Sequence, residues 1–226
     1  FGFTSLATIY YNQKENKNDD IFNIDKNKYN CCGTIMDYLV WLYTGCPDQC
    51  FIDYTNAASW GLFDITKNEW DTEAIKDLGI DLKILPKILK TGSKAGELCS
   101  EYRKKYQINL TNTSISVKCA LGDNQSSIVA TGKKIDEELY ITFGTGTQLS
   151  IVIDKEDSAK MEKSEKYEIR PFPFDKLLVV AAPLSGGKSW ELLKDMAKDL
   201  FQNFEVLSDY SDGRIYEKLD EMALAE

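Results

Sequence analysis

The stretch LLVVAAPLSGGKSWELLKDM, residues 177–196, joins a strand-like apolar run to a glycine pair followed by Lys188 and Ser189. This order is typical of the phosphate-binding loop G-x-x-x-x-G-K-[ST], although Ala182 stands where the first glycine belongs. Such a loop opens a nucleotide domain that needs a later strand ending in aspartate. Only a short segment without such a strand follows Ser189. A P-loop NTPase that uses Lys188 is therefore an alternative and not the main interpretation.

A second candidate is the carboxylate of Asp123 in LGDNQSS. It follows a predicted strand and a glycine, and it precedes a predicted helix whose N-terminus favours negative charge. Ligands of α/β proteins collect at the carboxyl ends of strands, so Asp123 is a candidate catalytic base. The structural alternative is that Asp123 only caps the helix by accepting hydrogen bonds from its first amides.

A third candidate is the glycine-rich segment Gly144-Thr145-Gly146. It separates two runs of strand-forming residues within 138–154, which predicts a β-hairpin. Two glycines allow a phosphate to approach the backbone closely, and a hydroxyl lies between them. An ordinary hairpin turn is the alternative.

The residue types that are missing limit the chemistry. The chain has no histidine, which excludes Ser-His-Asp and Cys-His nucleophilic catalysis. Cys46 and Cys50 have the spacing of half a zinc site, but no second half follows, so we expect no protein-bound metal. The adjacent Cys31 and Cys32 are interpreted as small apolar residues of a reducing compartment.

The amino-acid composition limits the classes of protein to which the chain can belong. The 226 residues are 43% hydrophobic and 28% charged, as in a globular protein. With 36 acidic and 27 basic residues, the net charge is −9, which argues against binding to nucleic acid or to an anionic membrane. No secretory signal and no membrane-spanning apolar run is apparent, so we expect a cytoplasmic protein.

Mixed periodicities along the chain predict an α/β fold. GTIMDYLVWLYTG, residues 33–45, is typical of a buried helix closed by a glycine. Apolar residues recur at helical spacing after the glycine pair, which predicts an amphipathic helix that faces the core. They are Trp190, Leu193, Ala197, Leu200, Phe201 and Phe204.

The order of several motifs resembles a known family. DYTNAASWGLFDITKNEWD, then LGI and LP, then GDNQ, then GTGT is similar to the middle of an FGGY carbohydrate kinase. GTIMDYLVWLYTG before these motifs and LLVVAAPLSGG after them fit the same order. NAASWGLF and AAPLSGG are most similar to the sedoheptulokinases of that family. The resemblance covers roughly residues 4–211, and it depends on the order of the motifs.

The resemblance implies an actin-like, ribonuclease-H-like two-domain sugar kinase fold, incomplete at both ends. Residues 1–132 would finish the sugar-binding domain, and residues 133–226 would begin the ATP-binding domain. The implied activity is phosphorylation of a sugar hydroxyl, of a ketose such as sedoheptulose, with ATP and Mg²⁺. Phosphoryl transfer depends on alignment and charge neutralisation, which agrees with the absence of histidine.

The resemblance also implies roles for individual residues. Asp123 would be the general base, and Asn124 would lie beside the sugar. Gly144, Thr145 and Gly146 would hold the ATP phosphates, and Gly186 and Gly187 would line the nucleotide side. Asp123 and Thr145 would border one shared hollow.

The chain also departs from the family pattern. The amino-terminal D-x-G-T phosphate hairpin and the late glycine-rich adenosine motif are not found in it, so we expect this fragment to be inactive by itself. A second alternative is a non-catalytic sugar-sensing module on a decayed kinase fold. Gene sequence upstream of Phe1 discriminates the two, because a D-x-G-T hairpin there supports an enzyme.

Overall fold

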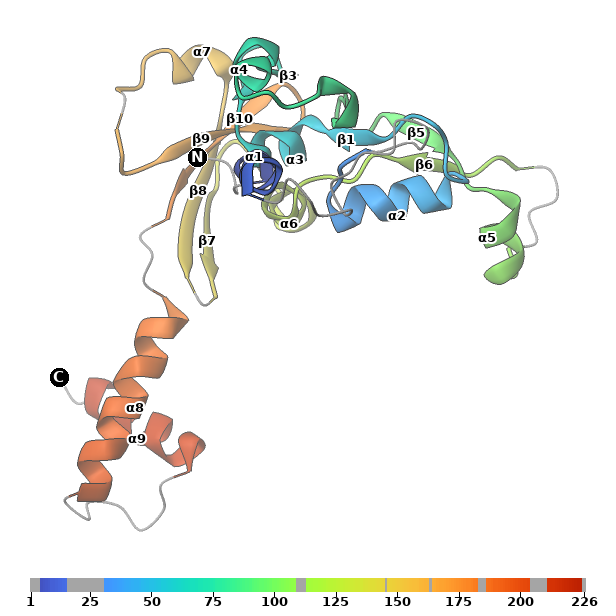
Figure 1. Cartoon of the computed structure of the whole chain (residues 1–226). Coiled ribbons are helices and arrows are strands. Elements are labelled where there is room, and N and C mark those ends of the chain that lie inside the picture. The colour runs from blue at the N-terminus through green and yellow to red at the C-terminus, as the bar shows by residue number, and fades with distance from the viewer. Residues whose placement is uncertain are drawn as a thin grey trace. The chain divides into compact units, whose positions relative to one another are not determined.

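The protein has a mixed α/β structure in the computed structural model, as the sequence predicts (Figure 1). The described residues are 5–15, 31–108, 113–144, 146–162, 164–182, 186–203 and 211–224. The chain divides into two compact units. The first unit comprises Phe1–Glu138, Val152–Lys163 and Glu168–Val179, and the second comprises Leu139–Ile151, Ser164–Tyr167 and Val180–Glu226.

The first unit holds most of the secondary structure. Its helices are α1 (Ser5–Glu15), α2 (Ile35–Tyr43), α3 (Tyr54–Ala57), η1 (Ala58–Trp60), α4 (Thr72–Asp77), η2 (Leu82–Ile84), α5 (Ser100–Lys105), α6 (Asp123–Thr131) and α7 (Lys155–Ser158). Its strands are β1 (Phe51–Asp53), β2 (Phe63–Asp64), β3 (Glu69–Trp70), β4 (Lys87–Leu89), β5 (Lys94–Glu97), β6 (Ser116–Lys118) and β9 (Glu168–Phe172). The second unit holds β7 (Leu139–Phe143), α8 (Gly187–Asn203) and α9 (Asp212–Leu224). β8 (Thr147–Ile153) and β10 (Lys176–Ala181) each contain residues of both units.

The strands pair in small sheets. β1 and β4 are parallel, with Ile52 opposite Ile88. The pairs β2–β3 and β5–β6 are antiparallel. Four further strands form one sheet in the order β7-β8-β10-β9.

Helix α2 confirms that residues 33–45 contain a helix, but the prediction that this helix is buried is wrong, because Ile35, Tyr38 and Leu39 are exposed. Thr34 caps it: the Asp37 amide donates to the Thr34 hydroxyl at 3.4 Å, and the Thr34 amide donates to the Asp37 carboxylate at 2.8 Å. This reciprocal capping box satisfies amides that the first helical turn leaves unpaired. After the helix, Gly45 adopts a φ of 84°, where a side chain would be strained.

The apolar core of the first unit gathers around β1. Ile52 and Ile75 are fully buried, and Trp60 is 3% exposed. The other buried members of this cluster are Leu6, Ala57, Ile80, Ile84 and Leu85. The core therefore packs around β1, and Asp53 is the last residue of this strand.

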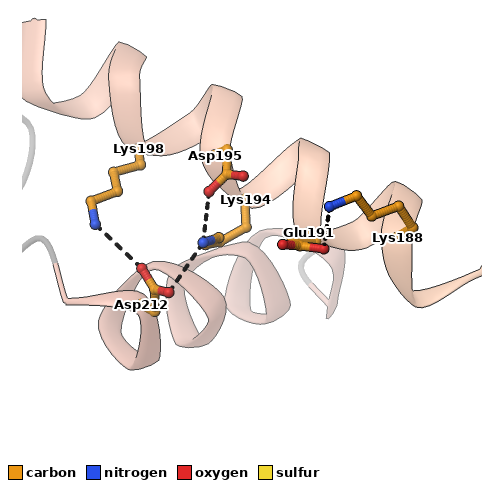
Figure 2. A network of polar contacts seen from close by, with 6 residues as sticks. All are labelled: Lys188, Glu191, Lys194, Asp195, Lys198 and Asp212. Atoms are coloured by element: carbon orange, nitrogen blue, oxygen red, sulfur yellow. Dashed lines mark hydrogen bonds and ion pairs between the residues drawn. The ribbon is translucent and has the colours of Figure 1, made fainter. Parts of the chain in front are cut away.

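In the second unit, the predicted hairpin is present: β7 and β8 are antiparallel, with Phe143 opposite Thr147. Helices α8 and α9 pack through Ala197, Ile215 and Leu219. Figure 2 shows the polar contacts that accompany this packing. Lys194 pairs with Asp195 at 2.6 Å and with Asp212 at 3.1 Å, and Lys198 pairs with Asp212 at 3.3 Å.

Helix α8 confirms the predicted helix, but the prediction that its apolar stripe faces a core is wrong for most of the described side chains. Ala197 is buried, whereas Trp190, Leu193 and Leu200 are 39%, 38% and 46% exposed. Among the described residues, the buried cluster that α9 forms with α8 includes only Ala197 of the stripe, together with Ile215 and Leu219. The side chain of Phe201 and the whole of Phe204 lie outside the described structure.

Candidate functional site

The buried carboxylate of Asp53 organises the end of β1. Its Oδ1 accepts hydrogen bonds from the Thr55 amide at 2.9 Å and from the Thr91 hydroxyl at 3.0 Å. The Thr55 hydroxyl donates to the same oxygen. The Cys119 thiol donates to Oδ2 at 3.4 Å, and burial, reinforced by the Asp53 charge, raises the pKa of Cys119 to about 12. These donors compensate for burial of a fully enclosed carboxylate.

The network continues to the first turn of α6. The Thr55 hydroxyl accepts a hydrogen bond of 3.0 Å from the amide of Gly122, which is the N-cap residue of α6. A Cβ at Gly122 would lie 2.7 Å from Oε1 of the buried Gln125, so a side chain there would displace the end of Gln125. Gln125 in turn donates to the Pro171 carbonyl at 3.0 Å. The start of α6 is thus held from two sides by distant segments.

These contacts position Asp123 as the first residue of α6. Its side chain is exposed, and its Oδ1 accepts from the Asn124 amide at 2.7 Å. Gly122 and not Asp123 occupies the N-cap position, although the Asp123 carboxylate still accepts this one hydrogen bond from an amide of the first turn. The carboxylate therefore faces solvent on a helix N-terminus, where negative charge is favoured.

Asn124 carries an unusual feature. Its side-chain nitrogen is buried and has no hydrogen-bond partner among the residues that the structure describes. A buried donor without a partner costs free energy, and such groups are rare in folded proteins. An oxygen-rich ligand beside Asp123 would supply the missing acceptor.

In the second unit, the predicted phosphate-binding glycines lie together. The Gly187 amide donates to the Gly144 carbonyl at 2.8 Å, and the Gly144 amide donates to the Gly146 carbonyl at 2.9 Å. A Cβ at Gly186 would lie 2.6 Å from the carbonyl carbon of Gly146. The β7–β8 turn and the N-terminus of α8 therefore form one glycine-lined corner, although they are distant in sequence.

Thr145 lies outside the described residues. Asp123 belongs to the first unit and the glycine corner to the second. The expected shared hollow between Asp123 and Thr145 therefore stays a prediction, as do the roles of all seven predicted site residues.

Lys188 is the residue on which the P-loop alternative depends. It lies in the first turn of α8 and pairs with Glu191 at 2.7 Å (Figure 2). The preceding amide, of Gly187, is already bonded to Gly144 and does not face an open loop. In a P-loop, backbone amides of this segment point at the phosphates, so the observed bond weakens that alternative.

Sequence reasoning assigned no role to Asp53 and Thr55. The signal was present, since Asp-x-Thr is typical of an aspartate that bonds to the backbone two residues later. No local sequence pattern predicts the hydrogen bond from Gly122 to Thr55, because the two residues are 67 positions apart.

The described residues also bear on metal binding and on membrane spanning. Within these parts of the chain, no three Cys, Asp or Glu side chains gather as metal ligands. No helix there is both long and apolar enough to cross a membrane.

The fold is that of sugar kinases. A xyloylose kinase from Brucella ovis superposes with a TM-score of 0.70 at 16% identity, over 85% of this chain and 37% of that chain. A gluconate kinase from Lactobacillus acidophilus superposes with a TM-score of 0.64 at 18% identity, over 93% of this chain and 38% of that chain. The predicted α/β sugar kinase fold is confirmed.

The family follows from sequence. The model of the FGGY family of carbohydrate kinases, N-terminal domain, matches residues 13–130. The chain belongs to the FGGY family of carbohydrate kinases. It is 30% identical to a sedoheptulokinase of Mus musculus over 161 residues and 32% identical to one of Homo sapiens over 162.

These two matches confirm the predicted resemblance to the sedoheptulokinases. Each covers 70% of this chain and 32% of the relative. The chain thus spans about a third of the length of these curated relatives.

Proposed function

We propose that the protein containing this chain transfers a phosphoryl group from ATP to a sugar hydroxyl, and that the sugar is a ketose such as sedoheptulose. The observation that carries this proposal is the pair at the start of α6. There an exposed carboxylate, Asp123, adjoins the buried side-chain nitrogen of Asn124, which has no hydrogen-bond partner among the residues that the structure describes. Family membership and the likeness to sedoheptulokinases support the substrate class.

In the proposed reaction, the Asp123 carboxylate accepts the proton of the sugar hydroxyl as its oxygen forms a bond to the γ-phosphorus. The bond from that phosphorus to the β-phosphate oxygen breaks, and ADP leaves. Asn124 donates its side-chain N–H to a neighbouring sugar hydroxyl, which holds the acceptor against Asp123. Placing the reacting atoms accounts for much of the rate in phosphoryl transfer.

The glycine corner fits a triphosphate because it brings bare backbone close to the start of a helix. The amides of Gly144 and Gly187 are occupied by internal bonds, so these residues would shape the corner. Gly146, Thr145 and Gly186 would then make the direct contacts. Mg²⁺ would neutralise charge on the phosphates, and those phosphates would supply most of its ligands.

The same proposal includes the domain boundaries, the activity of the isolated chain and its location in the cell. Residues 1–132 would complete a sugar-binding domain and residues 133–226 would begin an ATP-binding domain. We expect the 226-residue chain by itself to show no ATP turnover. A cytoplasmic location agrees with the six free cysteines and with the use of ATP.

The proposal is tested by ADP release from the gene product that contains these residues, over a panel of ketoses and polyols. Asp123→Asn is expected to lower kcat by about 100-fold or more, because a general base contributes about 10²–10⁴. Its KM for ATP should stay unchanged. Full activity in Asp123→Asn would overturn the assignment of the base.

The same panel separates the alternatives. Loss of nucleotide binding in Lys188→Ala, with nucleotide binding intact in Asp123→Asn, would favour the P-loop NTPase. Sugar binding without ADP release would favour the non-catalytic sugar-sensing module.

A further inference from the structure

The loop of residues 119–122 leads to the candidate base Asp123, and both ends of this loop are tied to one buried carboxylate. The loop directly follows β6 and directly precedes α6, which begins at Asp123. The carboxylate is that of Asp53, which is fully buried at the end of β1. Its two oxygens serve different ends of the loop.

The first end of the loop is held at Cys119. The Cys119 thiol donates to Asp53 Oδ2 at 3.4 Å, and the Cys119 amide donates to the Ser93 carbonyl at 3.1 Å. Burial, reinforced by the Asp53 charge, raises the pKa of this thiol to about 12. Cys119 therefore keeps its proton at neutral pH and remains a donor to Asp53.

The second end of the loop is held at Gly122, through Thr55. The buried Gly122 amide donates to the Thr55 hydroxyl at 3.0 Å, and this hydroxyl donates to Asp53 Oδ1. The Thr55 amide donates to the same oxygen at 2.9 Å, which fixes Thr55 against the carboxylate. A change at Asp53 would therefore loosen both ends of the loop.

The Asp123 carboxylate itself has little to hold it. It is exposed, and within the described parts of the chain its one hydrogen bond comes from the adjacent Asn124 amide at 2.7 Å. This bond lies within the first turn of α6 and moves with that helix. The place of the carboxylate in the first unit therefore depends on the backbone of the loop 119–122.

We propose that Asp53 is a positioning residue for the candidate base, because its two oxygens fix the two ends of the loop that carries Asp123. This inference rests on the proposed function, in which Asp123 accepts the proton of a sugar hydroxyl. Asp53 is fully buried, so it acts on the reaction through the loop and not by contact with the sugar. A displacement of about 1 Å at a reacting group can cost about 100-fold in rate, so a loosened loop lowers kcat.

The first experiment measures ADP release by the Asp53→Asn variant of the gene product that contains these residues. Asparagine keeps the size of the side chain but offers one acceptor oxygen in place of two, so one end of the loop loses its acceptor. We expect kcat to fall by about 10–100-fold, with an unchanged KM for ATP. Asp37→Asn is the matched control, since it makes the same change at a buried carboxylate whose donors are Thr34 and Asn56. Its kcat should stay within about twofold.

Variants of Thr55 test the same loop if Asp53→Asn does not fold. Thr55→Val removes the link to Gly122 and should lower kcat by about tenfold, whereas Thr55→Ser keeps the hydroxyl and should restore kcat to within about twofold. Thr55→Val combined with Asp123→Asn should be no slower than Asp123→Asn alone, because no base is left to misplace. A purely structural role of Thr55 would instead multiply the two losses.

Amide hydrogen exchange of the 226-residue chain tests the loop without catalysis. Thr55→Val should speed exchange by about tenfold or more in peptides that cover residues 119–124, and it should leave α4 unchanged. Thr55→Ser should exchange like the unmodified chain. Equal acceleration in α4, or unchanged exchange at residues 119–124, would overturn the positioning role.

The kinetic outcomes separate this inference from the proposed function. Full kcat in Asp53→Asn and in Thr55→Val, together with a large loss in Asp123→Asn, would overturn the positioning role and leave the proposed function intact. Full activity in Asp123→Asn would overturn the assignment of the base, and the positioning role with it.

Discussion

The Gly122 amide donates a 3.0 Å hydrogen bond to the hydroxyl of Thr55, and this bond joins the end of β1 to the first turn of α6. Thr55 in turn donates to the fully buried Asp53. A single hydroxyl thus acts as donor and acceptor between two segments. The candidate base Asp123 follows Gly122 directly, so its position depends on this link.

Thr55→Val should lower the free energy of unfolding by about 2 kcal/mol, because it leaves the Gly122 amide without its partner in a buried position. Thr55→Ser keeps the hydroxyl and should cost less than about 1 kcal/mol. Urea denaturation of both variants makes the comparison. Equal losses would show that packing of the methyl group matters more than the hydrogen bond.

Asn124→Leu should keep or raise the stability of the ligand-free chain, since it removes a buried donor that has no partner in the described structure. The same change should weaken sugar binding by about tenfold or more, because a donor to the sugar is lost. Thermal unfolding and titration calorimetry with a ketose measure the two effects. A stability loss with unchanged sugar affinity would contradict the proposed contact.

Gly186→Ala should destabilise the glycine corner by about 1–3 kcal/mol, because its Cβ would overlap backbone atoms of Gly146. Gly213→Ala is the matched control: it lies in α9, and a Cβ there meets no atom within 4 Å. The control should be neutral or slightly stabilising, as alanine favours helix. Thermal unfolding and ATP binding of the two variants are compared.

Lys194→Met should loosen the pair of helices α8 and α9. Lys194 bridges Asp195 and Asp212 (Figure 2), and its hydrogen bond to Asp212, together with that of Lys198, lowers the pKa of the Asp212 carboxyl. Lys188→Met is the control, since it breaks a solvent-exposed pair within one helix. Limited proteolysis should cleave the Lys194 variant faster than the control. Identical cleavage rates would show that the apolar contacts alone hold the helices.

The buried carboxyl of Asp37 should make the stability of the folded chain depend on pH. Burial raises the pKa of this carboxyl above its ordinary value of 3.8, although hydrogen bonds from Thr34 and Asn56 oppose the rise. The folded state therefore binds the proton more tightly than the unfolded state does. The contribution of Asp37 to stability is largest below its ordinary pKa and declines as pH rises through the folded-state pKa.

Asp37→Asn removes this titration. The unfolding free energy of the unmodified chain minus that of the variant should therefore fall as pH rises from the ordinary pKa of 3.8 through the raised folded-state pKa, and denaturation curves at a series of pH values measure it. A difference that rises with pH would show that the hydrogen bonds outweigh burial.

Local patterns predicted the elements well where the signal was contained in a few neighbouring residues. The helix within 33–45, the hairpin around Gly144 and the helix after Gly186 are all present. Asp123 follows a strand and begins a helix, as expected, but the N-cap residue of that helix is the preceding Gly122. The apolar stripe of α8 was assigned to a core because periodicity shows which residues share a face and not what covers that face.

The amino-acid sequence by itself determined the family, the α/β class and the candidates Asp123 and Asn124, because motif order and short-range periodicity are properties of neighbouring residues. Only the tertiary structure decided that Thr55 holds Gly122 and that Gly187 contacts Gly144. Each of these contacts joins residues that are distant in the chain. Such contacts depend on how buried apolar segments pack around β1 and beside α8, and no local pattern encodes that packing.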